Sequence, residues 1–173
     1  MDRLYGEIVS RDKLLQLITK RPWLLPVLYH VYSYGEIDYG ELKQILGIRG
    51  PLLKRALWWL VKYGIIKRRD SRFRVSSGYR GFLEELFLNR CIVRRYYVFR
   101  IGMTYIVVVV RRTRISTYTV PSKPVEELSR LEANAGAKFT VKDLVDTLGI
   151  SSKLAYRVIK THDLLRECVE KPS

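Results

Sequence analysis

The side chains that most often carry out enzymatic chemistry are few and widely separated in this sequence. His30 and His162 lie far apart, with no Cys or carboxylate nearby at metal-ligand spacing, so structural or surface positions are expected for both. Cys91 and Cys168 form neither a CxxC motif nor a disulfide framework, and we expect two reduced thiols. The phosphate-binding and nucleophile motifs GxxxxGK(S/T), GxGxxG and GxSxG are missing. The sequence therefore predicts no enzyme, no cofactor and no metal site.

Binding of anions is the chemistry that the sequence favours. The 173 residues include 32 Lys+Arg and 17 Asp+Glu, which gives a net charge of +15 and a pI near 10.0. Residues 1–90 carry 17 basic and 9 acidic side chains, residues 91–120 carry 6 and none, and residues 121–173 carry 9 and 8. The positive charge is thus concentrated in the first two thirds, as expected for a partner with a phosphate backbone or an anionic membrane surface. A metal-dependent nuclease on 91–120 is excluded, because that stretch has no carboxylate to hold the ions.

The remaining composition predicts where the protein works. The longest aliphatic run, Ile106–Val110, is far shorter than the roughly 20 residues that span a bilayer, and the N-terminus lacks the apolar core of a signal peptide. We therefore expect a cytoplasmic, nucleoid-associated protein with no membrane segment. Asn, Gln, Met and Cys occur only twice each, a bias reported for proteins of hot organisms, so we expect a thermophilic source.

The elements that position the basic side chains are clearest in residues 38–76. Asp38 and Glu41 form a capping pair for a first helix, and Gly47 suits its left-handed C-cap. After a tight turn, a second helix is expected over Pro51–Tyr63. At about 100° per residue, one side of that helix is apolar and includes Trp59, whereas the other is basic with a tryptophan in its middle. The basic side carries Lys54, Arg55, Trp58 and Lys62.

A basic hairpin comes next, with strands at 65–69 and 72–75 and a turn at Asp70-Ser71. Its arginines are Arg68, Arg69, Arg72 and Arg74. Together with the two helices, this stretch resembles the winged helix-turn-helix DNA-binding domains of prokaryotic and archaeal regulators over roughly residues 23–76. The resemblance implies that the second helix enters the major groove and that the hairpin, the wing, touches the backbone or the minor groove.

The pattern of 38–76 recurs at a constant offset of 102. Leu46, Gly47 and Ile48 are answered by Leu148, Gly149 and Ile150, and a further capping pair is expected at Thr140 and Asp143. The second stretch also resembles helix-turn-helix regulators but lacks a clear basic wing. The residues of its second helix expected to contact DNA are Ser152, Lys153, Tyr156, Arg157 and Lys160.

Strands are expected between the two units, over 92–101, 105–110 and 115–120, which we interpret as a long hairpin. Its arginines either protect a sheet edge or form a second nucleic-acid surface. The candidate contacts there are Arg111, Arg112 and Arg114. Pro121–Pro124 is interpreted as a stiff linker.

These features predict an α+β, mainly α chain with an N-terminal winged domain (1–90), a β-hairpin segment (91–121) and a C-terminal helix-turn-helix domain (122–173). The expected function is sequence-specific or architectural binding of double-stranded DNA as a transcriptional regulator. Two alternatives remain open: a docking subunit of a larger nucleoprotein assembly, with the C-terminal unit contacting protein, and RNA binding. A homodimer is also expected, because the run Ile106–Val110 and the helical stretch 78–89 offer surplus apolar surface.

Overall fold

The fold of the protein comes from a computed structural model, which describes residues 2–170. It is an α+β structure with eight α-helices and two small antiparallel sheets in the described range. The chain divides into two compact units, Met1–Leu88 with Val108–Thr117, and Asn89–Val107 with Tyr118–Ser173. No helix in the described range is both long and apolar enough to cross a membrane.

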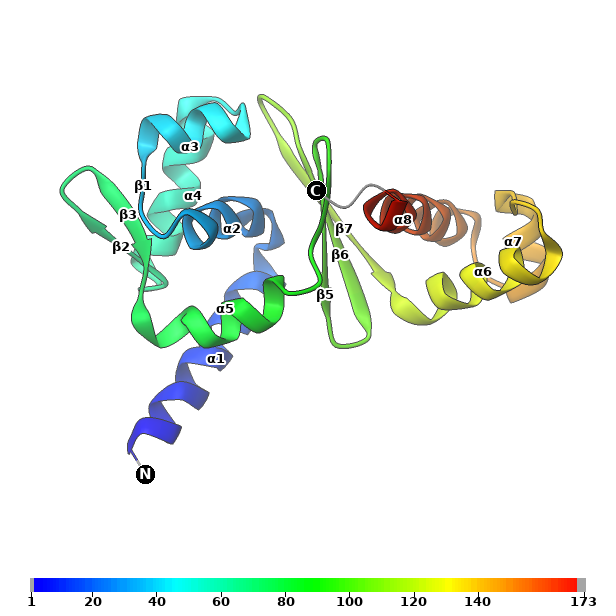
Figure 1. Cartoon of the computed structure of the whole chain (residues 1–173), viewed down its shortest axis with the longest axis horizontal. Helices are drawn as coiled ribbons and strands as arrows, with labels where there is room; N and C mark the ends of the chain where they lie inside the picture. The colour runs from blue at the N-terminus through cyan, green and yellow to red at the C-terminus, as the bar shows by residue number, and fades with distance from the viewer. Residues whose placement is uncertain (1, 171–173) are drawn as a thin grey trace. The chain divides into compact units, whose positions relative to one another are not determined.

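The first unit is built mostly of short helices around a buried aliphatic core (Figure 1). In chain order its elements are α1 (Asp2–Lys20), the 3-10 helix η1 (Pro22–Leu24), α2 (Leu25–Tyr34), β1 (Ile37–Asp38), α3 (Tyr39–Leu46), α4 (Gly50–Lys62), β2 (Ile66–Arg69), β3 (Arg72–Val75), the 3-10 helix η2 (Ser77–Tyr79) and α5 (Arg80–Phe87). Helix α2 lies at the centre: it contacts α3, α4, α5 and β3, and it buries Leu25, Val27, Leu28 and Val31.

Local signals in the sequence set the ends of α3 and α4. The backbone N–H of Glu41 donates to Asp38 Oδ1 at 2.8 Å, and the backbone N–H of Asp38 donates to the Glu41 carboxylate, so the predicted capping box is confirmed. Gly47 takes φ 63° and ψ 29°, which is the left-handed C-cap that glycine adopts at low cost. Pro51 lies in the first turn of α4, which begins and ends one residue before the predicted bounds.

The β2–β3 hairpin also forms as predicted, and it gains a third strand. The order in the sheet is β1-β3-β2, with Ile37 opposite Phe73 and Ile66 opposite Val75. These four side chains are buried. Strand β1 is only two residues long, too short to give a periodic pattern in the sequence, so it was not predicted.

The second unit combines a sheet with three helices (Figure 1). Its elements are β4 (Cys91–Val93), β5 (Tyr96–Ile101), β6 (Thr104–Val110), β7 (Ile115–Pro121), α6 (Ser122–Ala135), α7 (Val141–Leu148) and α8 (Ser152–Glu170), and the distal halves of β6 and β7 group with the first unit. The strand order β4-β5-β6-β7 is that of a meander. Helix α8 contacts β4, β5, α6 and α7, with Leu164 packed against Cys91, Val98 and Val107.

Three details differ from the sequence-based expectations. The predicted strand 92–101 is two strands, because the chain turns at Arg94, which has φ 54°. Pro121–Pro124 is not a linker: β7 runs into α6 at Ser122, whose side chain is buried and whose N–H donates to Met103 O at 2.8 Å. Residues 91–121 do not form a separate segment, since their strands are divided between the two units.

The apolar surface that suggested a homodimer is only partly buried. All five residues of Ile106–Val110 are at most 7 % exposed, and α5 buries Leu83, Leu86 and Phe87. Leu88, just after α5, is 69 % exposed. The run Ile106–Val110 therefore offers no surplus of apolar surface, and the homodimer stays a prediction.

The predicted repeat is confirmed at the level of local geometry. Helix α7 begins and ends 102 residues after α3, and α8 begins 102 residues after α4. The caps match as well: Asp143 N–H donates to Thr140 Oγ1 at 3.2 Å, and Gly149 takes φ 65° and ψ 28°. A further helix precedes each pair of helices, α2 before α3 and α4, and α6 before α7 and α8.

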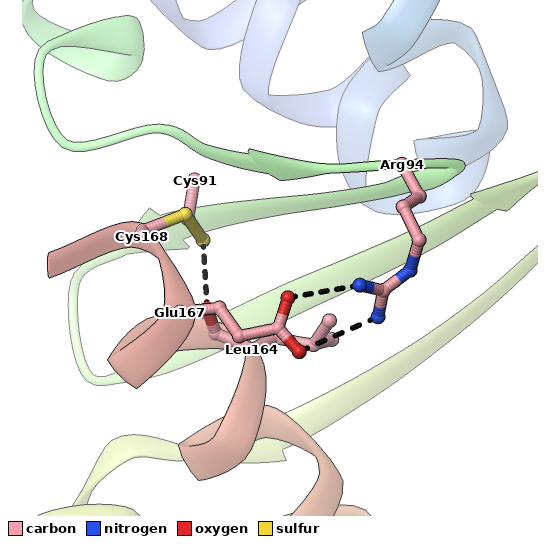
Figure 2. The surroundings of a disulfide bond; sticks show 5 residues. All are labelled: Cys91, Arg94, Leu164, Glu167 and Cys168. Carbon is pink, nitrogen blue, oxygen red and sulfur yellow. Dashed lines mark hydrogen bonds and ion pairs between the residues drawn. A yellow bond between two sulfur atoms is a disulfide. The ribbon is translucent and has the colours of Figure 1, made fainter. Parts of the chain in front are cut away.

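The expectation of two reduced thiols is wrong. Cys91 in β4 and Cys168 in α8 form a disulfide across 77 residues of sequence, with their Cα atoms 5.8 Å apart (Figure 2). An ion pair between the same two elements lies beside the disulfide: the Arg94 guanidinium donates two hydrogen bonds to the Glu167 carboxylate, at 3.0 and 3.4 Å. Spacing in the sequence could not reveal the pair, because only the packing of α8 on β4 brings the two cysteines together.

Candidate nucleic-acid interface

Helix α4 presents one basic, solvent-exposed face. Its buried side carries Leu53, Ala56, Leu57 and Leu60. The predicted side chains Lys54, Arg55, Trp58 and Lys62 are all exposed, so the structure brings this set together on one face. Trp58 lies in the middle of that face, and 54 % of it is exposed. A large aromatic side chain left uncovered among cations is unusual, since such side chains generally find a partner.

Contacts between cations and aromatic rings order this face. Lys62 Nζ lies 4.6 Å from the centroid of the Trp58 ring and 5.3 Å from that of Trp59. The Arg21 guanidinium lies 3.6 Å from the Trp59 centroid, and the two indoles meet edge to face at 5.0 Å. Trp59 is half-buried at the margin of the apolar side, not inside the core as the projection indicated. Cations at such distances are attracted to the ring quadrupole.

The register of the β2–β3 hairpin gathers four cations on one of its faces. Lys67 is directly opposite Arg74, and Arg69 is directly opposite Arg72. Because side chains alternate along a strand, these four share a face, which we call the cation quartet, whereas Arg68 shares the other face with Phe73. The quartet therefore contains three of the four predicted arginines together with Lys67, which was not among the predicted residues.

Two hairpin arginines have partners in the first unit. Arg72 Nε lies 3.6 Å from the carboxylate of Glu36, where both side chains are about half exposed. Arg68 Nε donates to the backbone oxygen of Asp70 at 3.0 Å, and its guanidinium lies 5.9 Å from the Phe73 ring. Lys67, Arg69 and Arg74 are exposed and make no ion pair with any residue in the described range.

A groove runs between α4 and the hairpin. It has a volume of about 520 Å³ and is lined by Tyr39, Lys54, Leu57, Trp58, Val61, Arg68, Ser71 and Phe73. Leu57 and Phe73 are almost fully buried, whereas Trp58 and Val61 are exposed. The groove therefore has apolar walls and one cation on each side, Lys54 from the helix and Arg68 from the hairpin. We call it the helix–hairpin groove.

The predicted arginines of the β6–β7 turn lie at the other end of α4. Arg111, Arg112 and Arg114 are exposed, and Arg112 O accepts a hydrogen bond of 2.8 Å from the backbone N–H of Arg49, just before α4 begins. Arg112, Arg49 and Lys43 line a shallow cleft of about 640 Å³ at the turn between α3 and α4. Arg49 and Lys43 were not among the predicted residues, although their position at the turn of the motif is readable in the sequence.

In the second unit, other elements cover much of the face of α8 that matches the exposed face of α4. Ser152, Lys153 and Tyr156 in its first turns are exposed. Arg157 and Lys160 are only partly exposed: the Arg157 guanidinium lies 5.3 Å from the Tyr118 ring, and Lys160 Nζ lies 4.6 Å from the Tyr96 ring. Leu164, which matches Lys62 in the repeat, is buried. From Arg157 to Leu165 every residue is buried or only partly exposed, so this stretch of α8 offers less open surface than α4 does.

The two histidines lie apart from these surfaces and have different surroundings. His30 is half-buried in α2 beside Tyr29, and burial lowers its pKa from 6.5 to about 4. His162 is buried in α8, with Nδ1 3.7 Å from Glu132 Oε2. Within residues 2–170 no group of three or more His, Cys, Asp or Glu side chains is arranged to hold a metal ion.

Comparisons of this chain with protein-family models, with curated proteins and with solved structures find no match. Its function must therefore be inferred from the geometry of its own residues.

Proposed function

We propose that the first unit is a winged helix-turn-helix that binds double-stranded DNA, and that the protein acts as a transcriptional regulator. In this proposal α4 enters the major groove through its exposed face, and the β2–β3 hairpin contacts the phosphate backbone. The order of helix α3, tight turn, helix α4 and basic hairpin supports it, because the resemblance to that superfamily rests on this order.

The observation that carries the proposal is the cation quartet. Like charges directly opposite each other on antiparallel strands destabilise a sheet, by about 0.2–1 kcal/mol per pair. Here both opposed pairs on one face of a hairpin with two four-residue strands are cationic, and only Arg72 is compensated by a carboxylate in the described part of the chain. A local rule broken without internal compensation is expected at a functional surface. A phosphate backbone laid along this face would supply the missing counter-charge.

The arginines of the β6–β7 turn extend the proposed surface. With Arg49 and Lys43 they add cations at the N-terminal end of α4, where the backbone N–H groups and the helix dipole also favour anions. Helix α8 is left out of the proposed interface, apart from its first turns, because Arg157 and Lys160 are engaged with tyrosine rings.

Salt-dependent binding tests the proposal. Affinity for duplex DNA, double-stranded RNA and single-stranded DNA is measured by fluorescence anisotropy at several salt concentrations. We expect duplex DNA to bind, with a slope of log affinity against log salt that flattens by about one unit for each phosphate contact removed. Lys67→Thr with Arg74→Thr removes one opposed pair, and Lys20→Thr with Lys123→Thr, at exposed positions outside the interface, is the control pair.

Stability gives the same test a second readout. Because the removed pair is repulsive, Lys67→Thr with Arg74→Thr is expected to raise the free energy of unfolding at low salt by a few tenths of a kcal/mol while weakening DNA binding. The control pair should leave DNA binding and its salt slope unchanged and should bring no gain in stability, because it puts threonine into helices. A variant that gains stability and binds DNA with an unchanged salt slope would reject the hairpin as a DNA contact. Failure of the wild-type protein to bind any nucleic acid at low salt would reject the whole proposal.

A further inference from the structure

We infer that the helix–hairpin groove is a binding site for an unpaired nucleobase, so that the protein prefers DNA with an extruded or unpaired base over a fully paired duplex. This inference rests on the proposed function, since it concerns the same surface. It names the structural class of DNA that the surface selects.

The position of Trp58 suits stacking rather than the reading of paired bases. An indole presents an extended flat face and a single N–H donor, so it reads the edges of paired bases poorly but stacks well on the face of an unpaired one. In this chain the indole is uncovered at the centre of a basic face. It also forms part of the wall of the groove.

One side of the indole is available to a base. Lys62 Nζ lies over the Trp58 ring at 4.6 Å, and Lys62 is not among the residues that line the groove. On the helix, Lys54 and Val61 lie to one side of Trp58 and line the groove, whereas Lys62 lies to the other side. A base entering the groove would therefore stack on the ring face opposite the ammonium. The edge contact with Trp59 helps to hold the indole in this orientation.

The groove matches a nucleotide in size and in chemistry. A volume of about 520 Å³ lies within the range of small-molecule sites, about 300–1,000 Å³, and leaves room for a base with its sugar. The walls are apolar, as the faces of a base require, through Val61, Leu57 and Phe73. Lys54 and Arg68 stand on opposite sides, so the phosphates before and after the base would each meet a cation. No carboxylate from the described residues lines the groove.

The two cations are also held in place. The Arg68 guanidinium is fixed by the hydrogen bond from Nε to Asp70 O, and it lies over the ring of Phe73. Lys54 Nζ lies 5.9 Å from the centroid of the Tyr39 ring. Side chains already ordered in the free protein lose less entropy on binding, which favours a defined site over diffuse attraction to a polyanion.

The test compares a blunt DNA duplex with the same duplex carrying one extra, unpaired thymine in the middle of one strand. Affinities are measured by anisotropy for the wild-type protein and for Trp58→Ala, Trp58→Phe and Tyr34→Ala. Tyr34 is a matched control because it is an aromatic residue, 58 % exposed, at the end of α2 and outside the proposed interface. Thermal melting of each variant checks that it folds.

We expect the wild-type protein to bind the bulged duplex about tenfold more tightly than the intact one, as expected for one stacked base. Trp58→Ala should lose this preference, because its affinity for the bulged duplex should fall by clearly more than its affinity for the intact one. Trp58→Phe should retain most of the preference, because phenylalanine also stacks, and Tyr34→Ala should behave as wild type. Tryptophan fluorescence should be quenched by the bulged duplex in the wild-type protein and much less so in Trp58→Phe.

Two results would overturn the inference while leaving the proposed function intact. One is equal binding of bulged and intact duplex by the wild-type protein. The other is an equal loss of affinity for both duplexes in Trp58→Ala, which would make Trp58 a general contact. Failure of the wild-type protein to bind either duplex at low salt would instead reject the proposed function, and the inference with it.

Discussion

At the scale of single residues, two neighbouring tryptophans have opposite surroundings. Trp58 and Trp59 are one residue apart on α4, so they point about 100° away from each other. Trp58 is exposed at the centre of the basic face, whereas Trp59 is half-buried under the Arg21 guanidinium. The same type of side chain is therefore open to solvent at one position and packed at the next.

Alanine substitutions at the two positions should separate these roles. We expect Trp58→Ala to change the free energy of unfolding by less than about 1 kcal/mol, because little packing is lost at an exposed site. Trp59→Ala should cost about 1–3 kcal/mol, since it removes a half-buried ring and its cation contact. Chemical denaturation of both variants gives the comparison. A larger loss for Trp58→Ala than for Trp59→Ala would contradict the assignment of the exposed face of α4.

His30 makes the stability of the first unit depend on pH. Burial lowers its pKa from 6.5 to about 4, so the folded protein keeps the ring neutral in a range where the unfolded chain takes up a proton. His30 therefore does not affect the free energy of unfolding above pH 6.5, and it lowers that free energy as the pH drops towards 4. We expect this histidine to account for a loss on the order of 2 kcal/mol over that window, allowing for solvent around a half-buried ring.

The measurement is urea denaturation of the wild-type protein and of His30→Gln at about pH 7.5, 5.5 and 4.5. The first pH lies above the ordinary pKa of histidine, 6.5, and the other two lie between that value and the lowered pKa of about 4. The difference between the two proteins isolates His30 from the carboxylates that also titrate in acid. As the pH falls, the wild-type protein should lose stability relative to His30→Gln, because only the wild-type chain takes up a proton at this position on unfolding. A difference that stays constant with pH would mean that His30 is not desolvated.

At the scale of elements, the same helix-turn-helix geometry is built twice from different side chains. Asp38 with Glu41 caps α3, and Thr140 with Asp143 caps α7, each with both reciprocal hydrogen bonds. The backbone N–H of Thr140 donates to the Asp143 carboxylate and holds the pKa of that group below its usual value. The caps stabilise the helix N-termini in both units without any contribution from the surrounding core.

Removing either cap should have a similar effect. Asp38→Ala and Thr140→Ala are each expected to lower the free energy of unfolding by about 1 kcal/mol, the usual cost of losing such a cap. Thr147→Ala is the control, because Thr147 is exposed near the end of α7, away from the cap, and its replacement should be neutral or slightly stabilising, since alanine is the better helix former. Denaturation of the three variants tests this. If Thr140→Ala matched Thr147→Ala, the capping box of α7 would not contribute to stability.

The second helix of each repeat leads into different structure in the two units. After α4 the chain forms the β2–β3 hairpin and leaves the outer face of the helix open. Helix α8 instead continues to Glu170 and packs on β4 and β5, which covers the face that matches the exposed face of α4. The exchange of Lys62 for Leu164 at equivalent positions agrees with this difference.

At the scale of the whole molecule, the disulfide covalently joins two residues that are 77 positions apart in the sequence. Closing a loop of 77 residues restricts the unfolded chain, which in the loop-entropy model stabilises the fold by about 4 kcal/mol. Disulfides are rare in cytosolic proteins except in hyperthermophiles. A cytoplasmic location and an oxidised pair are therefore compatible if the source is thermophilic, as the composition predicts.

The disulfide should make stability depend on reducing agent. We expect dithiothreitol to lower the melting temperature of the wild-type protein markedly and to leave Cys91→Ser with Cys168→Ser unchanged. The double variant should melt near the reduced wild-type protein. Thermal melts with and without reductant, together with a free-thiol assay, test this. Two reactive thiols in the protein purified without reductant would contradict the disulfide.

The sequence by itself determined those features that depend on residues close together in the chain. The capping pairs, the glycine turns, the bounds of α4, the hairpin and the offset of the repeat were all predicted, because their signals lie within a few residues of each other. The exposed basic face of α4 was predicted for the same reason, since its residues match the period of one helix. Trp59 was misplaced only because it lies at the edge of that projection.

Only the tertiary structure decided the features that depend on contacts between distant segments. The disulfide, strand β1 and the covering of Arg157 and Lys160 all require partners far away in sequence. The cation quartet needed strand register, which decides that Lys67 and not Arg68 joins the basic face. Periodicity reports which side of an element is apolar, but not which other element packs there. For that physical reason the second helix of each repeat looked alike in the sequence, although one is open and the other is enclosed.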